Sequence, residues 1–421
     1  MKSKIFFALG PLFAAFILLG VLLASPLSLT PKYSGKQLKE FAADPMNRAA
    51  FVGYSVKQQA MADKSFLPVM GSSELERFDP YHPSVYSFKY QTSYTPFLLG
   101  QPGTQSLTHY FWLNSVAPEM QHRKIIFIIS PQWFVKRGIL PAMLENFTSK
   151  GEIDNWLMTA NPKDVATQTL AKRLLAFKSF DSDSSIHSAL ESLQKGEALK
   201  PFNRFEVQVA ARIWKREDSL FSGFDTGLTA SKNPLNNLSK LAQRLPDEVH
   251  FSQLDSEAHN MAESNSGNNP YRINDKVWDK SLKNRVDRME GYQTKVSYLQ
   301  SPEYTDFQLL LNEFVKNHDD VQFIIQPVNN KWYSYTGLSQ KMLQQFSSKI
   351  KEQLASQGFT HIADYTNKSK TPYYVSDTDH IGYRGWVAVD KSISDFMKSK
   401  STSSYHLDNG KYLSEDWQKA K

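Results

Sequence analysis

The stretch that decides the fold is Lys124-Ile125-Ile126-Phe127-Ile128-Ile129-Ser130, followed at once by Pro131-Gln132-Trp133. Five consecutive apolar residues bounded by a lysine and a serine are typical of a strand buried on both faces. Runs of the same kind occupy residues 66–70, 95–99, 321–326 and 359–363. Each ends in a small or polar loop, and helical patterns follow several of them. This alternation predicts an α/β protein with a mostly parallel sheet flanked by helices.

Three features refine this prediction. Pro68 lies within the run 66–70 and cannot donate a ladder hydrogen bond, which predicts an edge position or a local break there. Between residues 139 and 301 the strand signal fades, which predicts a large, mainly helical insertion. An apolar stripe at spacings of three and four predicts an amphipathic helix packed on the sheet; it consists of Trp386, Val389, Ile393, Phe396 and Met397.

The N-terminal segment predicts one membrane crossing. From Ile5 to Ala24 the chain carries no charge, and a helix of that length matches a hydrocarbon core of roughly 30 Å. Lys2 and Lys4 would hold the short end in the cytoplasm, so the bulk of the protein would lie outside the cell membrane. A cleaved signal peptide is the alternative, although its apolar region is normally shorter and Leu22-Leu23-Ala24 offers no A-x-A cleavage pattern.

Composition limits the classes of partner. The chain has no cysteine, so an exported domain would fold without disulfides or a thiolate metal site, as at a Gram-positive cell surface. The net charge of +7 favours an anionic partner such as phospholipid head groups or a phosphate-bearing wall polymer, unless it is only a solubilising surface. The predicted topology argues against nucleic acid. No histidine pair has the H-x-x-x-H spacing of a helical metal site, and no cofactor is expected.

The predicted organisation has five parts. These are a cytoplasmic stub and transmembrane anchor (1–29), a helical stalk (30–65), an α/β catalytic domain (66–138 and 302–400), the helical insertion (139–301) and a polar C-terminal tail (401–421), either docked or partly disordered.

One candidate nucleophile follows the first predicted strand, in Gly71-Ser72-Ser73-Glu74-Leu75. Ser73 would project at the carboxyl edge of the sheet, where open α/β sheets bind their ligands. The structural alternative is a capping box made by Ser73 and Glu76, which starts a helix without any chemistry.

A candidate base and its orienting acid lie near the C-terminus. In Asp377-Thr378-Asp379-His380, the carboxylate of Asp377 could hold one imidazole nitrogen of His380 while the other nitrogen faces a nucleophile. Asp379 is an alternative orienting carboxylate. A D-x-x-H sequence is common, and it could equally be a turn with a helix cap.

Two further loops follow predicted strands and carry oxyanion candidates. The Gly103 N–H and the Gln132 side-chain amide could bind a developing oxyanion together with the Ser73 N–H. Ser72 and Gln105 are further candidates for binding the oxyanion or the substrate. Gln105 and Gln132 could also be ordinary loop hydrogen-bonders. The four loops together supply a nucleophile, a base, an orienting acid and oxyanion donors, which predicts a serine acyl-transfer site.

The order of these motifs resembles the SGNH/GDSL hydrolases. More closely, the chain resembles the DltD family in its N-terminal segment, residues 71–75, residues 103–107, residues 130–134, and Asp377-x-x-His380 with Gly382. The resemblance implies an SGNH-hydrolase-like, flavodoxin-like fold with Ser73 as nucleophile, His380 as base and Asp377 as orienting acid. Two positions depart from the SGNH pattern. Gln132 stands where asparagine is usual, and Ser72 replaces the usual aspartate.

The resemblance also implies a function, in the D-alanine esterification of lipoteichoic acid. The implied partners are lipoteichoic acid, a membrane-bound O-acyltransferase, a small membrane peptide and a D-alanyl carrier protein. A surface esterase acting on wall polymer or lipid would need the same Ser-His-Asp site. A binding module for teichoic acid or a carrier protein, with Ser73 only capping a helix, is the non-enzymatic alternative.

Overall fold

The sheet confirms the predicted α/β architecture. The computed structural model describes residues 2–25, 30–229, 233–400 and 404–421. Its five strands are all parallel and are ordered β2-β1-β3-β4-β5, with the bounds β1 (Phe66–Met70), β2 (Thr95–Leu99), β3 (Lys124–Ile129), β4 (Asp320–Ile325) and β5 (Ile362–Asp364). This order is that of flavodoxin-like doubly wound sheets, in which ligands bind at the switch point between β1 and β3.

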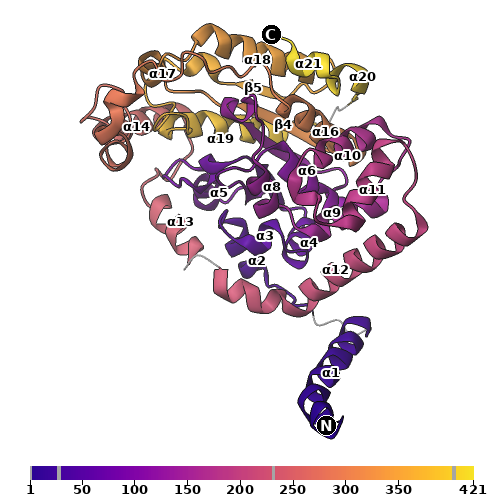
Figure 1. The fold of residues 1–421 in the computed structure, drawn as a ribbon. Helices are drawn as coiled ribbons and strands as arrows, with labels where there is room; N and C mark the ends of the chain where they lie inside the picture. Colours follow the sequence, from indigo (N-terminus) through magenta and orange to yellow (C-terminus); the bar gives the residue numbers. More distant parts are fainter. Residues whose placement is uncertain (1, 26–29, 230–232, 401–403) are drawn as a thin grey trace.

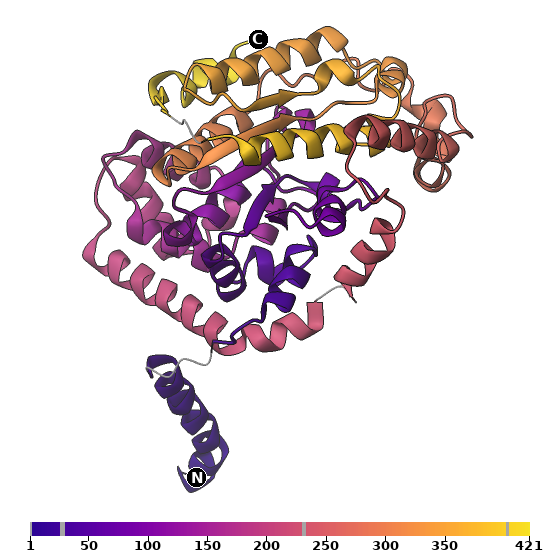
Figure 2. The same ribbon diagram turned by 180° about the vertical axis from the view of Figure 1, so that it is seen from behind.

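Both faces of the sheet are covered by helices (Figures 1 and 2). Along β3, Ile125, Phe127 and Ile129 belong to one buried apolar cluster, whereas Ile126 and Ile128 belong to the other. The first cluster includes side chains of α6 (Ser106–Ser115), α16 (Glu303–Lys316) and α18 (Gln340–Ala355), and the second those of α5 (Pro83–Tyr90) and α19 (Tyr383–Lys398). Burial of alternate residues on opposite faces explains why the strand sequence is continuously apolar.

Two strand predictions can be settled. Of the two alternatives for Pro68, the edge position is wrong, because β1 is an interior strand; a local break fits, because the pairing of β1 with β3 begins only after Pro68, at Val69 and Met70. The last strand begins at Ile362 instead of 359, because the Phe359 N–H donates to the Leu354 carbonyl and closes the end of α18.

Between β3 and β4 the described chain contains helices and loops but no strand. Before α16, its longer helices are α8 (Pro141–Phe147), α9 (Lys150–Thr159), α10 (Val165–Leu175), α11 (Ser184–Gln194), α12 (Pro201–Thr229), α13 (Pro234–Ala242) and α14 (Phe251–Ser264). α14 packs on α19, and α9 packs on α6, so this region contributes to the covering of both faces. α12 runs along the outer margin of the molecule (Figure 1).

The segment expected to form a stalk is part of the folded domain. Its helices are α2 (Gly35–Ala42), α3 (Arg48–Phe51) and α4 (Ser55–Ala62). Phe41, Phe51 and Met61 are buried in the same apolar cluster as β3. At the other end of the chain, α20 (Asn409–Tyr412) and α21 (Glu415–Lys419) pack on α16, and Lys349 Nζ donates to the carbonyls of Trp417 and Ala420.

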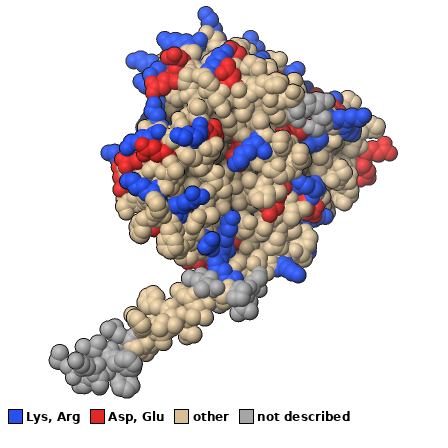
Figure 3. All heavy atoms as spheres, turned by 90° about the vertical axis from the view of Figure 1, so that its right-hand side faces the viewer, with Lys and Arg blue, Asp and Glu red and all other residues tan. Residues whose placement is uncertain are grey.

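The first helix, α1 (Lys2–Ala24), projects away from the folded domain (Figures 1 and 3). Its residues 11–21 are exposed. Over the described part of the chain, no helix has both the length and the apolar character required to cross a membrane, so the predicted single span is not supported.

Candidate active site

Ser73 lies directly after β1, at the carboxyl edge of the sheet. It begins a short 3₁₀ turn, Ser73–Glu76, and Ser72 stands at the N-cap position without a side-chain capping bond. The capping box considered for Ser73 and Glu76 is therefore not formed. Instead, Ser73 Oγ lies 2.8 Å from Nε2 of His380, 307 residues further along the chain.

Tight backbone packing fixes the turn that carries Ser73. A Cβ on Gly71 would lie 2.1 Å from Glu74 Oε1, and one on Gly100 would lie 2.6 Å from the Ser72 carbonyl oxygen. Glu74 is buried; burial raises the pKa of its carboxyl, and Oε1 accepts the Ser72 N–H at 2.6 Å. The glycines thus allow the ends of β1 and β2 to approach closely, which explains why small residues precede the nucleophile.

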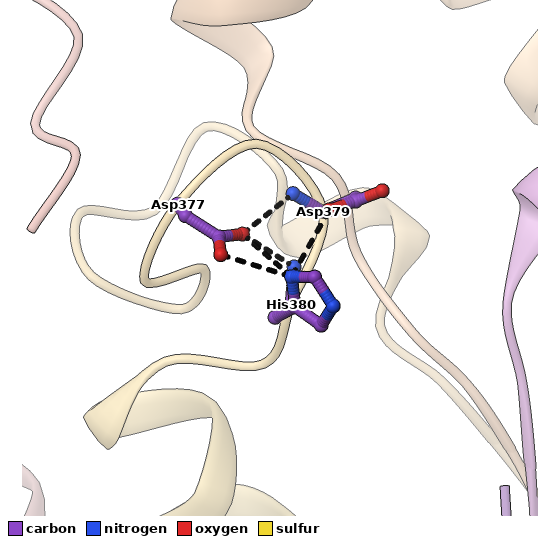
Figure 4. Close-up of side chains that lie close together, drawn as sticks. All are labelled: Asp377, Asp379 and His380. Carbon is purple, nitrogen blue, oxygen red and sulfur yellow. Dashed lines mark hydrogen bonds and ion pairs between the residues drawn. The ribbon is translucent and has the colours of Figure 1, made fainter. Parts of the chain in front are cut away.

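His380 and Asp377 lie in a loop between β5 and α19. His380 Nδ1 is 2.9 Å from both carboxylate oxygens of Asp377, and Asp379 Oδ1 is 3.1 Å from the same nitrogen (Figure 4). Asp377 Oδ1 also accepts the backbone N–H groups of Asp379 and His380, and Oδ2 pairs with the Arg77 guanidinium. One carboxylate therefore orients the imidazole and also folds the loop around it.

Further contacts stabilise the loop that carries Asp377 and His380. Val375 and Ile381 form an antiparallel bridge, and Asn329, which follows β4, donates its side-chain amide to the Asp377 carbonyl at 2.8 Å. Neither Arg77 nor Asn329 was predicted from the sequence. Both were missed because their partner is distant in sequence, although Asn329 does follow a predicted strand, as the other site residues do.

The charges of this group shift two pKa values in opposite directions. Burial disfavours the imidazolium, but the carboxylates of Asp377 and Asp379 outweigh it and raise the pKa of His380 to about 10. Burial acts to raise the pKa of Asp377, yet the His380 and Arg77 cations lower it to about 2. The resting pair is therefore an imidazolium and a carboxylate at neutral pH.

The same three side chains have atoms close enough to chelate a cation. Among the described residues, donor atoms of Asp377, Asp379 and His380 lie within 4.8 Å of one another. The Asp377 oxygens already accept from Arg77, from Nδ1 of His380 and from two backbone N–H groups. A metal ion would have to displace the guanidinium and the imidazole proton, so the arrangement fits a charged triad better than a metal centre.

The predicted oxyanion residues lie on neighbouring loops but are not joined to Ser73. Gly103 follows β2 at a φ of 98° and packs against Met143, and Gln105 stands at the N-cap position of α6. Gln132 lies in the 3₁₀ turn Pro131–Phe134 after β3 and is half-buried. The Ser72 hydroxyl donates to the Gln101 carbonyl at 3.1 Å. In the described chain no hydrogen bond links any of these four residues to Ser73.

Comparison with known proteins agrees with the motif order. A family model described as "DltD protein" matches residues 43–398. The chain belongs to the DltD family. It is 36% identical over 412 residues to Protein DltD of Lacticaseibacillus rhamnosus, covering 97% of this chain and 95% of the relative. It is 34% identical to Protein DltD of Bacillus subtilis (strain 168), with coverages of 96% and 100%, and 26% identical to that of Staphylococcus aureus, with coverages of 95% and 97%.

Proposed function

We propose that this DltD-family chain takes part in D-alanylation of lipoteichoic acid through a serine acyl-transfer site of SGNH-hydrolase type. The observation that carries the proposal is the continuous Ser73–His380–Asp377 hydrogen-bonded chain, with distances of 2.8 and 2.9 Å. Its position after β1, beside the switch point of a flavodoxin-like sheet, supports a ligand-binding role.

In this mechanism Ser73 Oγ attacks the carbonyl carbon of a D-alanyl ester or thioester. The serine proton passes to Nε2 of neutral His380, and then to the oxygen or sulfur of the leaving group as the tetrahedral intermediate collapses. A hydroxyl of the glycerol-phosphate or glycolipid acceptor attacks the acyl-serine, and His380 receives its proton. That proton returns to Ser73 as the D-alanyl ester is released.

The two aspartates stabilise the imidazolium formed in each of these steps. Asp377 also fixes the Nδ1–H tautomer, since its oxygens are the acceptors at 2.9 Å. Because the pKa of His380 is raised to about 10, the neutral imidazole is a minor species at pH 7. In this proposal the two aspartates therefore stabilise the imidazolium form of His380 and reduce the fraction of neutral imidazole that can accept the serine proton.

The backbone N–H groups of Ser73 and Gly103 and the amide of Gln132 are the oxyanion donors in this proposal. Loss of one such donor costs about 2.7–4 kcal/mol of transition-state stabilisation. The site is proposed to work at the outer face of the cell membrane, held there by the uncharged stretch Ile5 to Ala24. Membrane attachment would raise the local concentration of the site near a lipid-linked acceptor.

The direct test is the D-alanine content of lipoteichoic acid in cells that produce Ser73→Ala at the normal level. We expect the ester-linked D-alanine to be lost while the teichoic acid itself remains. Ser72→Ala is the matched control, because the Ser72 hydroxyl donates to the Gln101 carbonyl and has no hydrogen bond to Ser73 or His380 in the described chain. Wild-type D-alanine content in Ser73→Ala cells would refute the serine mechanism.

A second assay separates transfer from hydrolysis. Purified protein is incubated with D-alanylated lipoteichoic acid, and free D-alanine is measured. Slow release is expected for a transferase, because water must be kept from the acyl-serine. Rapid release that depends on Ser73 would assign the chain to the esterases instead.

A further inference from the structure

α12 carries an exposed apolar stripe that the acyl-transfer site does not use. Phe202 is 70% exposed, Phe205 62% and Ile213 38%, and Val209 between them is half-exposed. Their spacings of three, four and four residues place them on one side of the helix. On the opposite side Val207 and Ala211 are buried, where α12 packs against α9 and α11. Large aromatic side chains in a row on a protein surface mark an interaction face.

This stripe leads directly to the end of α1. The next positions on the same side of α12 are Arg216 and Leu220, at spacings of three and four. Arg216 Nη2 donates to Ser25 Oγ at 3.0 Å, and Leu220 is buried. In Figure 1 α12 lies along the margin of the domain from which α1 projects. The exposed face of α12 therefore lies next to the base of α1.

The exposed side chains of α1 indicate what covers this surface. Residues 11–21 are exposed on every side of the helix, and Phe13, Phe16 and Leu18 are each more than 60% exposed. In Figure 3 the part of this projecting helix that is not grey carries no charged side chain, unlike the domain above it. Apolar side chains directed all round a helix suit hydrocarbon surroundings better than a single protein partner, which would cover one side.

The charges around the part of α12 that carries the stripe agree with an anionic lipid surface. Between residues 200 and 218 basic residues outnumber acidic ones, although the complete helix has equal numbers of both; the basic ones are Lys200, Arg204, Arg212, Lys215 and Arg216, and the acidic ones Glu206, Glu217 and Asp218. Asp218 is already engaged, since it accepts the Ser55 N–H at 2.6 Å. Aromatic side chains flanked by arginine are typical of helices that lie in the boundary between head groups and acyl chains.

We propose that α12 is an in-plane membrane helix, with Phe202, Phe205, Val209 and Ile213 inserted into the outer boundary of an anionic bilayer. Together with α1 it gives the domain two contacts with the membrane. Two contacts fix the orientation of the domain relative to the lipid surface, which a single contact would leave free. This proposal rests on the membrane attachment given in the proposed function, but it is independent of the chemistry assigned to Ser73.

The absence of cysteine from the chain allows a direct test. Phe205→Cys and Ile213→Cys in the full chain are each labelled with an environment-sensitive fluorophore. The protein is then reconstituted in vesicles of phosphatidylglycerol and phosphatidylcholine. Arg204→Cys is the matched control, since it is exposed on the same turn but points away from the stripe. All three substitutions replace exposed side chains, so the fold is expected to persist.

We expect nitroxide-bearing lipids to quench the labels at 205 and 213 at least about twofold more than the label at 204. Equal quenching at the three positions, or none at 205 and 213, would overturn the proposal. Protection of 205 and 213 from a water-soluble quencher that rises with protein concentration, without quenching by lipid, would also overturn it and would assign the face to a second copy of the chain.

Discussion

Two groups of loops meet at the carboxyl edge of the sheet, and they are held in different ways. The loop with Asp377 and His380 is joined to Arg77, to Asn329 and to itself by charged and backbone hydrogen bonds. The loops with Gly103 and Gln132 have no hydrogen bond to Ser73 in the described chain. The comparison teaches that the proton-transfer half of the candidate site is assembled in advance, whereas the oxyanion half would be completed by the substrate.

Asp377→Asn should cause the largest loss of activity, because it changes the proton-transfer half of the candidate site. The amide would present N–H to Nδ1 of His380 and favour the wrong tautomer, and we expect acyl-transfer activity to fall about 10⁴-fold. Asp379→Asn is the control, because Asp379 reaches the same nitrogen at 3.1 Å without binding Arg77. We expect that variant to change kcat by less than about tenfold. Equal losses in the two variants would mean that Asp377 has no special role.

Gln132→Ala tests the oxyanion half of the candidate site. If its amide binds the oxyanion, kcat should fall about 10²- to 10³-fold with KM nearly unchanged. Gln105→Ala is compared in the same assay. Gln105 Oε1 is buried beside the N-terminus of α6, so its loss should affect stability more than rate. The reverse ranking of the two variants would move the oxyanion donor to the loop after β2.

The pH dependence should follow His380. Since its pKa is raised to about 10, the rate of Ser73 acylation should rise about tenfold per pH unit through the neutral range and level off near pH 10. Asp379→Asn removes one carboxylate and should move the midpoint to lower pH. Acylation rates measured with a chemically stable serine reagent give this profile. A midpoint near that of ordinary histidine would contradict the charged resting pair.

The smallest expected effect concerns stability. A histidine whose pKa is raised by folding stabilises the native state fully below its unfolded value of about 6.5, and this contribution is lost as pH rises toward 10. Asp377, with a lowered pKa, stabilises the native state above about 4 and loses this effect only as pH falls toward 2. Urea unfolding of wild type and His380→Gln should therefore differ more at pH 6 than at pH 10.

The sequence was most informative where local pattern and burial coincide. The run Ile125–Ile129 predicted its strand because both faces of β3 are covered, and the small residues 71–73 marked the turn after β1. The predicted start of β5 at Phe359 was wrong, because from sequence alone an apolar residue at the end of a helix cannot be distinguished from the first residue of a strand. Pro68 suggested either an edge or a local break; β1 is an interior strand, and its pairing with β3 begins only after Pro68.

In the candidate site, too, local motifs could be interpreted from the sequence, whereas contacts between distant residues could not. Asp377 and His380 are three residues apart, so their pairing could be proposed from one short motif. The ion pair between Asp377 and Arg77 joins residues 300 positions apart in sequence. It forms only because the fold brings their two loops together at the sheet edge, and no local sequence pattern predicts it. The assignments to Gly103, Gln105 and Gln132 stay predictions, because an oxyanion donor is defined by where the substrate lies.

The central claim is that Ser73 is an activated nucleophile, and covalent labelling tests it most directly. The full-length protein is treated with a serine-directed fluorophosphonate, and the adduct is located by mass spectrometry of its peptides. We predict one adduct, on Ser73, that persists in Ser72→Ala and is lost in Ser73→Ala and strongly slowed in His380→Gln. Absence of an adduct on Ser73, or labelling that is unaffected by His380→Gln, would contradict the account.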